Sequence, residues 1–468
     1  MWRFGNKQEC LNYVDSLPKD ANVGEYRRGM YPTVTTLEDL RNNLIQTKAS
    51  EDVRKCVEFV FKRYRNAIYI AFFDNLFYFI PFVNTDTPNE YEDYLQIDPI
   101  LQQELSDDIR SINGYFEKTN KDTRYVIRED KKTWNISNFM VKIEDYISPD
   151  PKFATYYYYE IYIFFLEIFS DIDFVTQNIG KRFDFIVNPI DQNLLRKDNK
   201  DPMFHIINPP LDNQAPFTQP FPSLIFNKIC PVLSFCKHVD YLDIPIPTPD
   251  DIARVMKLYS PPWCDPQYED LWDNNFKFAD WDSRIPIAVF RGSNTGWGLS
   301  DRTNPRMKIA NLSVKNPNLL DAGITSFVAR FKKVSTEKYI KRNYTKNIRK
   351  VKPLSYLQQT NYKYQVYIEG NVAAYRLGAM LASGSTILKV HSDYQIWFEP
   401  FLKEYVHYVP VSFDLSNLID QIRWCQQHDN ECKQIASNAR QFYNNFLGNG
   451  MFYYTKKILN NIASPYIN

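Results

Sequence analysis

The chain has 468 residues, a hydrophobic content of 44% and a net charge of +1. This hydrophobic content excludes an intrinsically disordered chain, and the balanced charge argues against a nucleic-acid-binding protein, which usually carries a basic excess. The length is typical of two or three domains.

Cysteine usage and the apolar stretches indicate a cytoplasmic protein without a transmembrane span. The seven cysteines lack CxxC spacing, and the N-terminus lacks the apolar core of a secretory signal. The apolar stretches at residues 67–83 and 156–169 contain acidic residues and are shorter than the roughly 20 residues of a membrane-spanning helix. We interpret residues 67–83 as a buried helix, with weak contact to a membrane surface as the alternative.

Residues 1–150 are predicted to form an accessory, mostly helical region. Thr35 and Thr36 precede the segment LEDLRNNLIQ and provide a helix N-cap. A second helical pattern spans residues 97–117. The many aromatic residues of this region are interpreted as packing residues.

Residues 151–275 are predicted to form a first α/β domain. A tyrosine-rich helix at residues 154–170 is followed by the apolar strand FDFIVN, and Asp191 comes shortly after this strand. Further strand patterns follow a Pro/Asn-rich passage at residues 201–222. Prolines next to Trp263 mark a hinge near the end of this domain.

Residues 276–445 are predicted to form a second α/β domain, followed by a C-terminal helix at residues 446–468. The strand IPIAVF comes first, and KIANLSVKNPNLLDAGIT then predicts a helix and a strand. VHYVPV is a further predicted strand. Residues 415–446 predict amphipathic helices, with Asp414 as the N-cap of the first.

Residues 362–390 predict a β-α-β unit within the second domain. The pattern gives a strand at 364–368, a glycine turn, a helix at 372–382 and a second strand at 386–390. Such a unit joins two parallel strands, and ligands of these sheets bind at the carboxyl ends of the strands.

Two loops of the second domain form the candidate site. The loop at residues 291–295 carries Arg291 and several backbone N–H groups, and Arg376 lies one turn beyond Gly370. Guanidinium groups and backbone N–H groups bind phosphate well. The alternative interpretation makes Arg291 and Arg376 members of structural ion pairs.

An ordered series of motifs extends from about residue 285 to residue 447. In chain order they are FRGS with Thr295, NPR at 304–306, KNP at 315–317, YKY at 362–364, Gly370, Ala373, Arg376, SGS at 383–385, VHYVPV at 406–411 and DLSNL at 414–418. This series resembles the protein O-glucosyltransferases and capsule-associated glycosyltransferases of family 90. The sequence departs from the family pattern at Asn294, at the insertion GWGLSDRTNP and at residues 358–361.

The resemblance implies an α/β fold of the GT-B type, with two facing Rossmann-like domains. It also implies an inverting transfer of glucose or xylose from a UDP-sugar to a hydroxyl group of a protein or glycan, with no cofactor besides the UDP-sugar donor. Cationic side chains at the diphosphate would take the place of a metal ion. The expected donor-binding residues are Arg291, Gly292, Ser293, Thr295, Arg306, Gly370, Ala373, Arg376, Ser383 and His391.

An inverting transferase also needs a general base that removes the proton of the acceptor hydroxyl. The resemblance places this base on an aspartate just after a strand of the first α/β domain, where Asp191 is the match and a capping role is its alternative. The other candidates for the base are Asp184, Asp240 and Asp243. The acidic triplets at 171–173 and 280–282 lie outside the donor loops, so we expect no metal site there. His407 is interpreted as a packing residue.

The competing hypothesis is a catalytically inactive family member that binds a glycan or a protein. The presence of both Arg306 and Arg376 argues against this hypothesis. The heavy use of Tyr, Asn, Ile and Lys is typical of AT-rich genomes and indicates a large DNA virus as the source.

Overall fold

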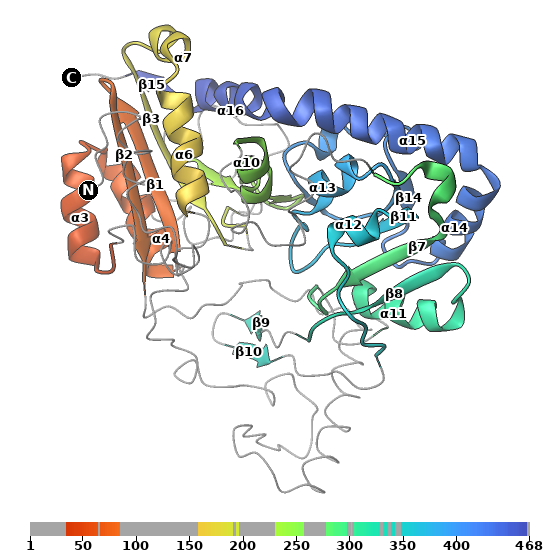
Figure 1. Cartoon of the computed structure of the whole chain (residues 1–468). Coiled ribbons are helices and arrows are strands. Elements are labelled where there is room, and N and C mark those ends of the chain that lie inside the picture. The colour runs from red at the N-terminus through yellow and green to blue at the C-terminus, as the bar shows by residue number, and fades with distance from the viewer. Residues whose placement is uncertain are drawn as a thin grey trace, which may run out of the picture.

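The computed structural model describes residues 34–63, 66–84, 158–190, 193–195, 230–256, 278–296, 301, 304–327, 331–335, 338–341 and 348–465. These residues form a mixed α/β structure built on two main sheets (Figure 1). Within these ranges, no helix has both the length and the apolar character needed to cross a membrane.

The first sheet has the strand order β2-β1-β3-β4-β6, and β15 pairs with β3. Its strands are β1 Asn66–Phe73, β2 Leu76–Val83, β3 Lys181–Asn188, β4 Val232–Ser234, β6 Ile244–Pro245 and β15 Ser464–Pro465. Strand β1 is antiparallel to both β2 and β3, whereas β3, β4 and β6 run parallel. The hairpin β1-β2 therefore shares one sheet with strands from the predicted first α/β domain.

The prediction of a buried helix at residues 67–83 is wrong, because this stretch is the β1-β2 hairpin. Asp74 and Asn75 form its turn with φ angles of 48° and 58°, and positive φ at both turn residues is typical of tight hairpins. Every residue of β1 is buried, since α3 (Leu37–Gln46) and α4 (Glu51–Arg63) cover one face and α6 (Tyr158–Phe169) covers the other (Figure 1). A strand buried on both faces has a continuous apolar run without alternation, which resembles a buried helix in the sequence.

The second sheet is parallel, with the strand order β14-β12-β11-β7-β8. Its strands are β7 Ile285–Gly292, β8 Leu320–Ile324, β11 Tyr362–Tyr367, β12 Thr386–Val390 and β14 Val409–Val411. The predicted strands of this region are confirmed. The chain reverses its direction of winding between the neighbours β7 and β11, and ligands of open α/β sheets bind at such a switch point, at the carboxyl ends of the strands.

The helices of the second half confirm the predicted order but correct two of the predicted starts. Helix α13 is Leu377–Ala382 and begins five residues later than predicted, because the Glu369 side chain accepts a hydrogen bond from Ala374 N and holds the preceding segment in a turn. The N-cap of α14 (Leu418–Gln427) is Asn417, not Asp414. The Asp414 carboxylate accepts a hydrogen bond from Ser416 N. By contrast, the predicted cap Thr36 accepts a hydrogen bond from Asp39 N.

The other elements are shorter segments and the C-terminal helices. They are α7 Ile172–Gln177, β5 Lys237–His238, α10 Pro249–Met256, η5 Trp281–Ser283, α11 Pro305–Lys315, β9 Phe331–Ser335, β10 Lys338–Lys341, α12 Tyr356–Gln359, β13 Tyr394–Gln395, η6 Glu399–Phe401, α15 Asp429–Phe442, the π-helix η7 Tyr443–Leu447 and α16 Gly448–Ile462.

Three connections join the first half, which is built on the first sheet, and the second half, which is built on the second sheet, into one hydrophobic core. Strand β5 from the first half pairs with β13 from the second. Helices α15 and α16 run in succession along the top of Figure 1 from the second sheet back to the first. Helix α10 contributes the buried Asp251, whose carboxylate accepts hydrogen bonds from Trp397 Nε1 at 3.0 Å and from Arg254 at 2.7 Å.

Several sequence predictions lie outside the described residues. They are the helix at 97–117, the Pro/Asn-rich passage at 201–222 and the hinge near Trp263. The division at residues 150, 275 and 445 stays a prediction. The described part of residues 1–150 contains the strands β1 and β2 in addition to α3 and α4.

Candidate functional site

A pocket of about 400 Å³ opens beside the carboxyl end of β7, and residues from the loop after β11 line it as well. This volume is in the range of ligand-binding pockets. The end of β7 contributes Arg291 and Gly292, and the loops after β7 and β11 contribute Ser293 and residues 374–376. The other lining residues are Asp250, Arg306, Thr325, Pro353, Leu354, Tyr356 and Gln359. The pocket therefore lies at the switch point of the sheet.

Arg306, in the first turn of α11, forms hydrogen bonds with both the loop after β7 and the loop after β11. Asn304 caps this helix by accepting a hydrogen bond from Met307 N, and Pro305 occupies the first turn. The buried guanidinium donates to four oxygen atoms at 2.7–3.3 Å, which are Glu369 O, Ile368 O, Ser293 O and Thr295 Oγ1. An arginine has five N–H donors, so four of them hold the loops in place.

The charge of Arg306 is poorly neutralised. Its four hydrogen-bond acceptors carry no formal charge. Burial, and then the positive charge of Arg376, lower the pKa of Arg306 to about 9, so the group stays protonated at neutral pH. Burial and then the neighbouring Glu399 raise the pKa of Glu369 to about 8, so this nearby carboxyl is mostly neutral at pH 7.

Arg376 is half-buried, and most of its N–H donors have no partner among the described residues. Its Nη1 donates to Arg291 O at 2.6 Å, and its guanidinium carbon lies 5.2 Å from the centre of the Phe290 ring. Across the described part of the chain, no carboxylate forms an ion pair with it. Within the ranges that the structure describes, the pocket thus contains two neighbouring guanidinium groups that form no ion pair with a carboxylate, which is an arrangement suited to a polyanion.

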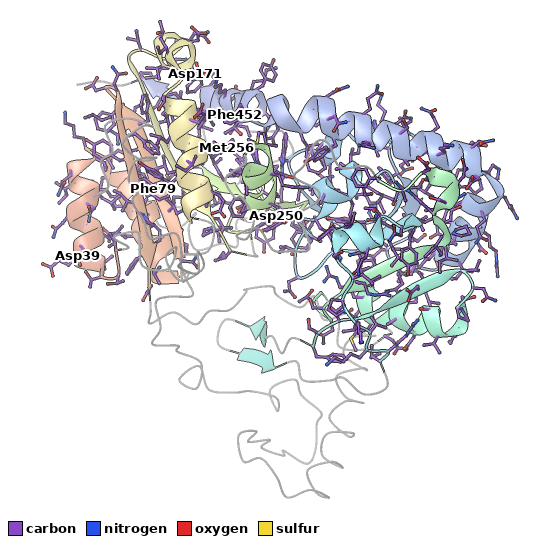
Figure 2. The ribbon with its side chains drawn as sticks, in the orientation of Figure 1. Asp39, Phe79, Asp171, Asp250, Met256 and Phe452 are labelled. Atoms are coloured by element: carbon purple, nitrogen blue, oxygen red, sulfur yellow. The ribbon has the colours of Figure 1, made fainter. Side chains whose placement is uncertain are left out.

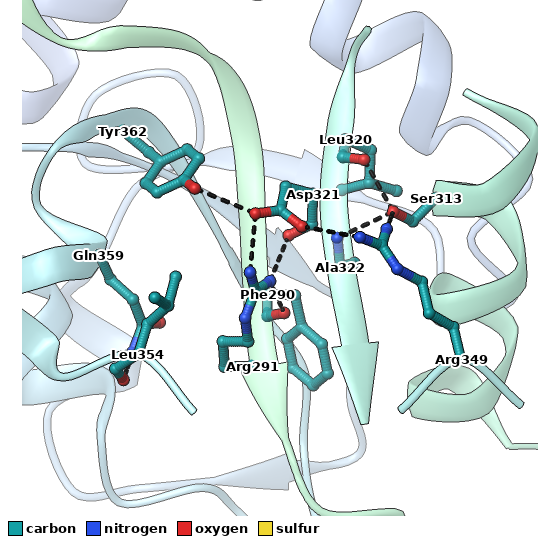
Figure 3. A network of polar contacts seen from close by, with 10 residues as sticks. All are labelled: Phe290, Arg291, Ser313, Leu320, Asp321, Ala322, Arg349, Leu354, Gln359 and Tyr362. Carbon is teal, nitrogen blue, oxygen red and sulfur yellow. Dashed lines mark hydrogen bonds and ion pairs between the residues drawn. The ribbon is translucent and has the colours of Figure 1, made fainter. Parts of the chain in front are cut away.

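Arg291 has a different role, because it forms an ion pair with Asp321 on β8 (Figure 3). Its Nη2 lies 2.7 Å from Asp321 Oδ2, and its Nη1 donates to Asp321 O and Phe290 O. Tyr362 and Arg349 also contact the Asp321 carboxylate. Burial opposes the shift, but the hydrogen bonds from Arg291 hold the pKa of Asp321 below its ordinary value. The alternative interpretation of a structural ion pair is therefore confirmed for Arg291.

Three glycines allow the loops to approach the guanidinium groups. A Cβ atom at Gly292 would lie 3.3 Å from Arg376 Nη2 and 3.5 Å from Arg306 Nη1. A Cβ atom at Gly370 would lie 3.3 Å from both Arg306 Nη2 and Thr295 Oγ1. Gly296 has a φ of +113° and packs directly against the Gly370 carbonyl. Side chains at Gly292 and Gly370 would crowd the cationic groups, and one at Gly296 would crowd the Gly370 carbonyl.

The structure brings together most of the predicted donor-side residues. Arg291, Gly292, Ser293, Arg306 and Arg376 line the pocket. Thr295 and Gly370 contact Arg306, and Ala373 is buried directly before Ala374, which lines the pocket.

Ser383 and His391 are not brought to this pocket. Ser383 follows α13 at the amino end of β12, where its carbonyl accepts a hydrogen bond from Arg284, so it lies at the opposite edge of the sheet. His391 follows β12 and has an exposed side chain, while its N–H donates to Val411 O. The order of the motifs in the sequence does not show that Ser383 lies at the edge of the sheet opposite the pocket.

The candidates for the general base separate by their surroundings. Asp191 lies outside the described residues. Asp184 forms an ion pair with Arg182 and accepts a hydrogen bond from the Tyr69 hydroxyl. Asp240 lies 3.7 Å from His238 and is exposed.

Asp243 is fully buried and accepts hydrogen bonds from Leu194 N, Leu195 N and Ser234 Oγ. These bonds give it a structural role. The carboxyl end of β4, the parallel neighbour of the strand β3 that precedes Asp191 in the chain, nevertheless comes close to the pocket. The ring of Phe235, directly after β4, lies 5.9 Å from that of the pocket residue Tyr375.

The acidic triplets and His407 also have structural roles. Asp171 caps α7 by accepting from Phe174 N and pairs with Lys456. Asp282 lies 3.5 Å from Lys433 on the surface. His407 Nδ1 accepts a hydrogen bond from Lys403 N, and its ring packs against Phe442. None of these side chains lines the pocket.

Sequence reasoning missed the other described pocket residues, among them Asp250, Tyr356 and Gln359. The segment PTPDD contains the signal of a helix start, with Thr248 as a cap and Pro249 in the first turn, but nothing local connects it with the donor loops. Gln359 belongs to the stretch where the sequence departs from the family pattern, and its Nε2 donates to Leu354 O.

Comparisons with known proteins give consistent matches. The family model described as Glycosyl transferase family 90 matches residues 201–465. Uncharacterized protein 179R of Invertebrate iridescent virus 6 is 30% identical over 439 residues, which is 83% of this chain and 35% of the relative. Uncharacterized protein 035R of Invertebrate iridescent virus 3 is 32% identical over 85% of this chain and 35% of the relative. Protein O-glucosyltransferase 2 of Danio rerio is 31% identical over 50% of this chain and 43% of the relative. The chain thus spans about a third of the length of the two viral relatives.

Proposed function

The chain belongs to glycosyl transferase family 90, and we propose that it is an inverting glycosyltransferase that uses a UDP-sugar. The transferred sugar is glucose or xylose, and the acceptor is a hydroxyl group of a protein or glycan. The observation that supports this proposal is the pair of guanidinium groups, Arg306 and Arg376, at the switch point of a parallel sheet.

Phosphate stabilisation accounts for the chemistry at this end of the pocket. When the glycosidic bond breaks, negative charge develops on the UDP that leaves. Arg306 is already held by four hydrogen bonds, so it stabilises that charge without reorganising. Arg376 offers four of its five N–H donors, since Arg291 O is the one acceptor of its hydrogen bonds among the described residues. With two cationic side chains in place, we expect the reaction to need no metal ion.

The pocket also has a less charged end that suits the nucleoside. Leu354, Tyr356 and Gln359 lie around α12 and supply apolar surface, a ring and an amide. An amide group is able to hydrogen-bond the polar edge of a uracil ring.

In the proposed enzyme, Asp191 removes the proton from the acceptor hydroxyl. It follows β3, and the contact between Phe235 and Tyr375 brings the neighbouring carboxyl end of β4 towards the pocket. We propose a GT-B arrangement in which residues 151–275 form the acceptor side and residues 276–445 form the donor side. The iridescent virus relatives support a large DNA virus as the source.

Release of UDP from UDP-glucose and from UDP-xylose tests the proposal. We expect wild-type protein to release UDP from one of them. The rate of release should fall more than about tenfold in Arg376→Ala, because one charge-assisted contact contributes more than about 1.4 kcal/mol. Asp191→Asn should abolish transfer to an acceptor while UDP binding persists. Binding of a glycan without turnover of either donor would instead favour the inactive binding module.

A further inference from the structure

Among the described residues that line the pocket, Asp250 is the one acidic residue, and the other charged lining residues are Arg291, Arg306 and Arg376. It is also the one lining residue from the first half of the described structure. Figure 2 places Asp250 at the end of α10 that faces the second half. The pocket is therefore completed by a carboxylate from across the boundary between the two halves.

The backbone of Asp250 is held firmly. Its carbonyl accepts a hydrogen bond from Arg254 Nε at 3.1 Å, and Thr248 Oγ1 caps the helix by accepting from Asp251 N at 3.2 Å. The neighbouring Asp251 is buried and bonded to Trp397 of the second half. A Cβ atom at Gly378 would lie only 2.4 Å from Asp251 Oδ1. Because α10 and α13 pack this closely, the position of Asp250 relative to Arg376 is fixed by the fold.

A carboxylate repels a diphosphate, so it is suited to another part of the ligand. Its two oxygen atoms accept hydrogen bonds from hydroxyl groups, and two adjacent hydroxyls of a sugar fit one carboxylate. In the proposed function, the nucleoside lies near α12 and the diphosphate lies at the arginines. The sugar is then the part of the donor that lies near α10.

We propose that Asp250 accepts hydrogen bonds from the hydroxyl groups of the donor sugar and thereby makes the pocket prefer a UDP-sugar to UDP. This inference rests on the proposed function. It assigns donor-sugar recognition to a residue of the first half, while the diphosphate is held by the second half.

Isothermal titration of the full chain with UDP, UDP-glucose and UDP-xylose tests the inference. The Asp250→Asn variant should bind the better UDP-sugar at least about tenfold more weakly than wild type, and its affinity for UDP should stay the same or rise, because the loss of a negative charge removes repulsion. Asp251→Asn is the matched control. It changes the adjacent carboxylate, which faces Arg254 and Trp397, so it should lower the melting temperature and leave the ratio of the two affinities unchanged.

Three outcomes would overturn the inference. The first is an equal loss of affinity for UDP and UDP-sugar in Asp250→Asn. The second is an equal change of the affinity ratio in both variants. The third is a fall in kcat with UDP-sugar affinity unchanged, which would make Asp250 act on the acceptor hydroxyl. Failure of the proposed function looks different, because wild-type protein would then bind none of the three nucleotides.

Discussion

Replacement of Arg376 by methionine separates ligand binding from stability. Met keeps most of the side-chain volume but removes the charge and all five N–H donors. A hydrogen bond to a charged group contributes about 1.5–3 kcal/mol, so loss of one contact to the diphosphate should weaken UDP binding about 10- to 150-fold. Among the described contacts, the fold loses the bond to Arg291 O and the contact with Phe290, and we expect a cost of about 1–2 kcal/mol because the side chain is half-exposed.

The assay is titration calorimetry with UDP, combined with thermal unfolding of the same samples. Arg291→Met is the matched control, since its guanidinium pairs with Asp321, whose side chain is 23% exposed. Breaking this pair should cost about 2–4 kcal/mol of stability, slightly less than for a fully buried pair. Its effect on UDP affinity should be smaller than that of Arg376→Met. Equal UDP affinity of Arg376→Met and wild type would refute the reasoning that the unused donors of Arg376 bind the diphosphate.

Three further predictions concern the scaffold around the pocket. Asp243→Ala should lower the free energy of unfolding by about 2–4 kcal/mol, because two buried backbone N–H groups lose their acceptor; urea titration measures this, and kcat of the folded protein should persist. Gly378→Ala should cost about 1–3 kcal/mol through overpacking against Asp251, visible in thermal unfolding. Glu369 has a pKa raised by burial to about 8 from an ordinary 4.5, so the folded chain holds a proton that the unfolded chain has released, and stability should fall as pH rises from about 4.5 to 8. In Glu369→Gln the melting temperature should decline less over that range. Loss of kcat in folded Asp243→Ala, an unchanged melting temperature in Gly378→Ala, or parallel pH curves for Glu369→Gln and wild type would contradict the respective prediction.

The second sheet was largely predictable from the sequence. Its central strands are short apolar runs bounded by Gly, Pro and Asn, and the predicted strand at residues 386–390 coincides with β12. The pocket loops after β7 and β11 were predictable for the same reason, because their residues follow strand ends directly. The start of α13 was not predictable, since the turn before it depends on the Glu369 side chain.

The features that the sequence did not predict depend on contacts between distant segments. The β1-β2 hairpin reads as a helix because helices cover both faces of β1, and the sequence pattern does not show what covers a strand. The pairing of Arg291 with Asp321 follows from the register of β7 against β8. Asp250 joins the pocket only through the packing of α10 against the second half.

The return of the chain to the first sheet affects how the protein is synthesised. Ser464 pairs with Arg182 across 282 positions, and Phe452 of α16 packs on Phe164 of α6 at 5.3 Å. While the ribosome is still adding residues near 440, the part of β3 that receives β15 has no partner and α6 keeps apolar surface open to water. The sheet of the half that supplies Asp250 therefore cannot be completed before residues 464–465 are made, although most of its strands are translated early.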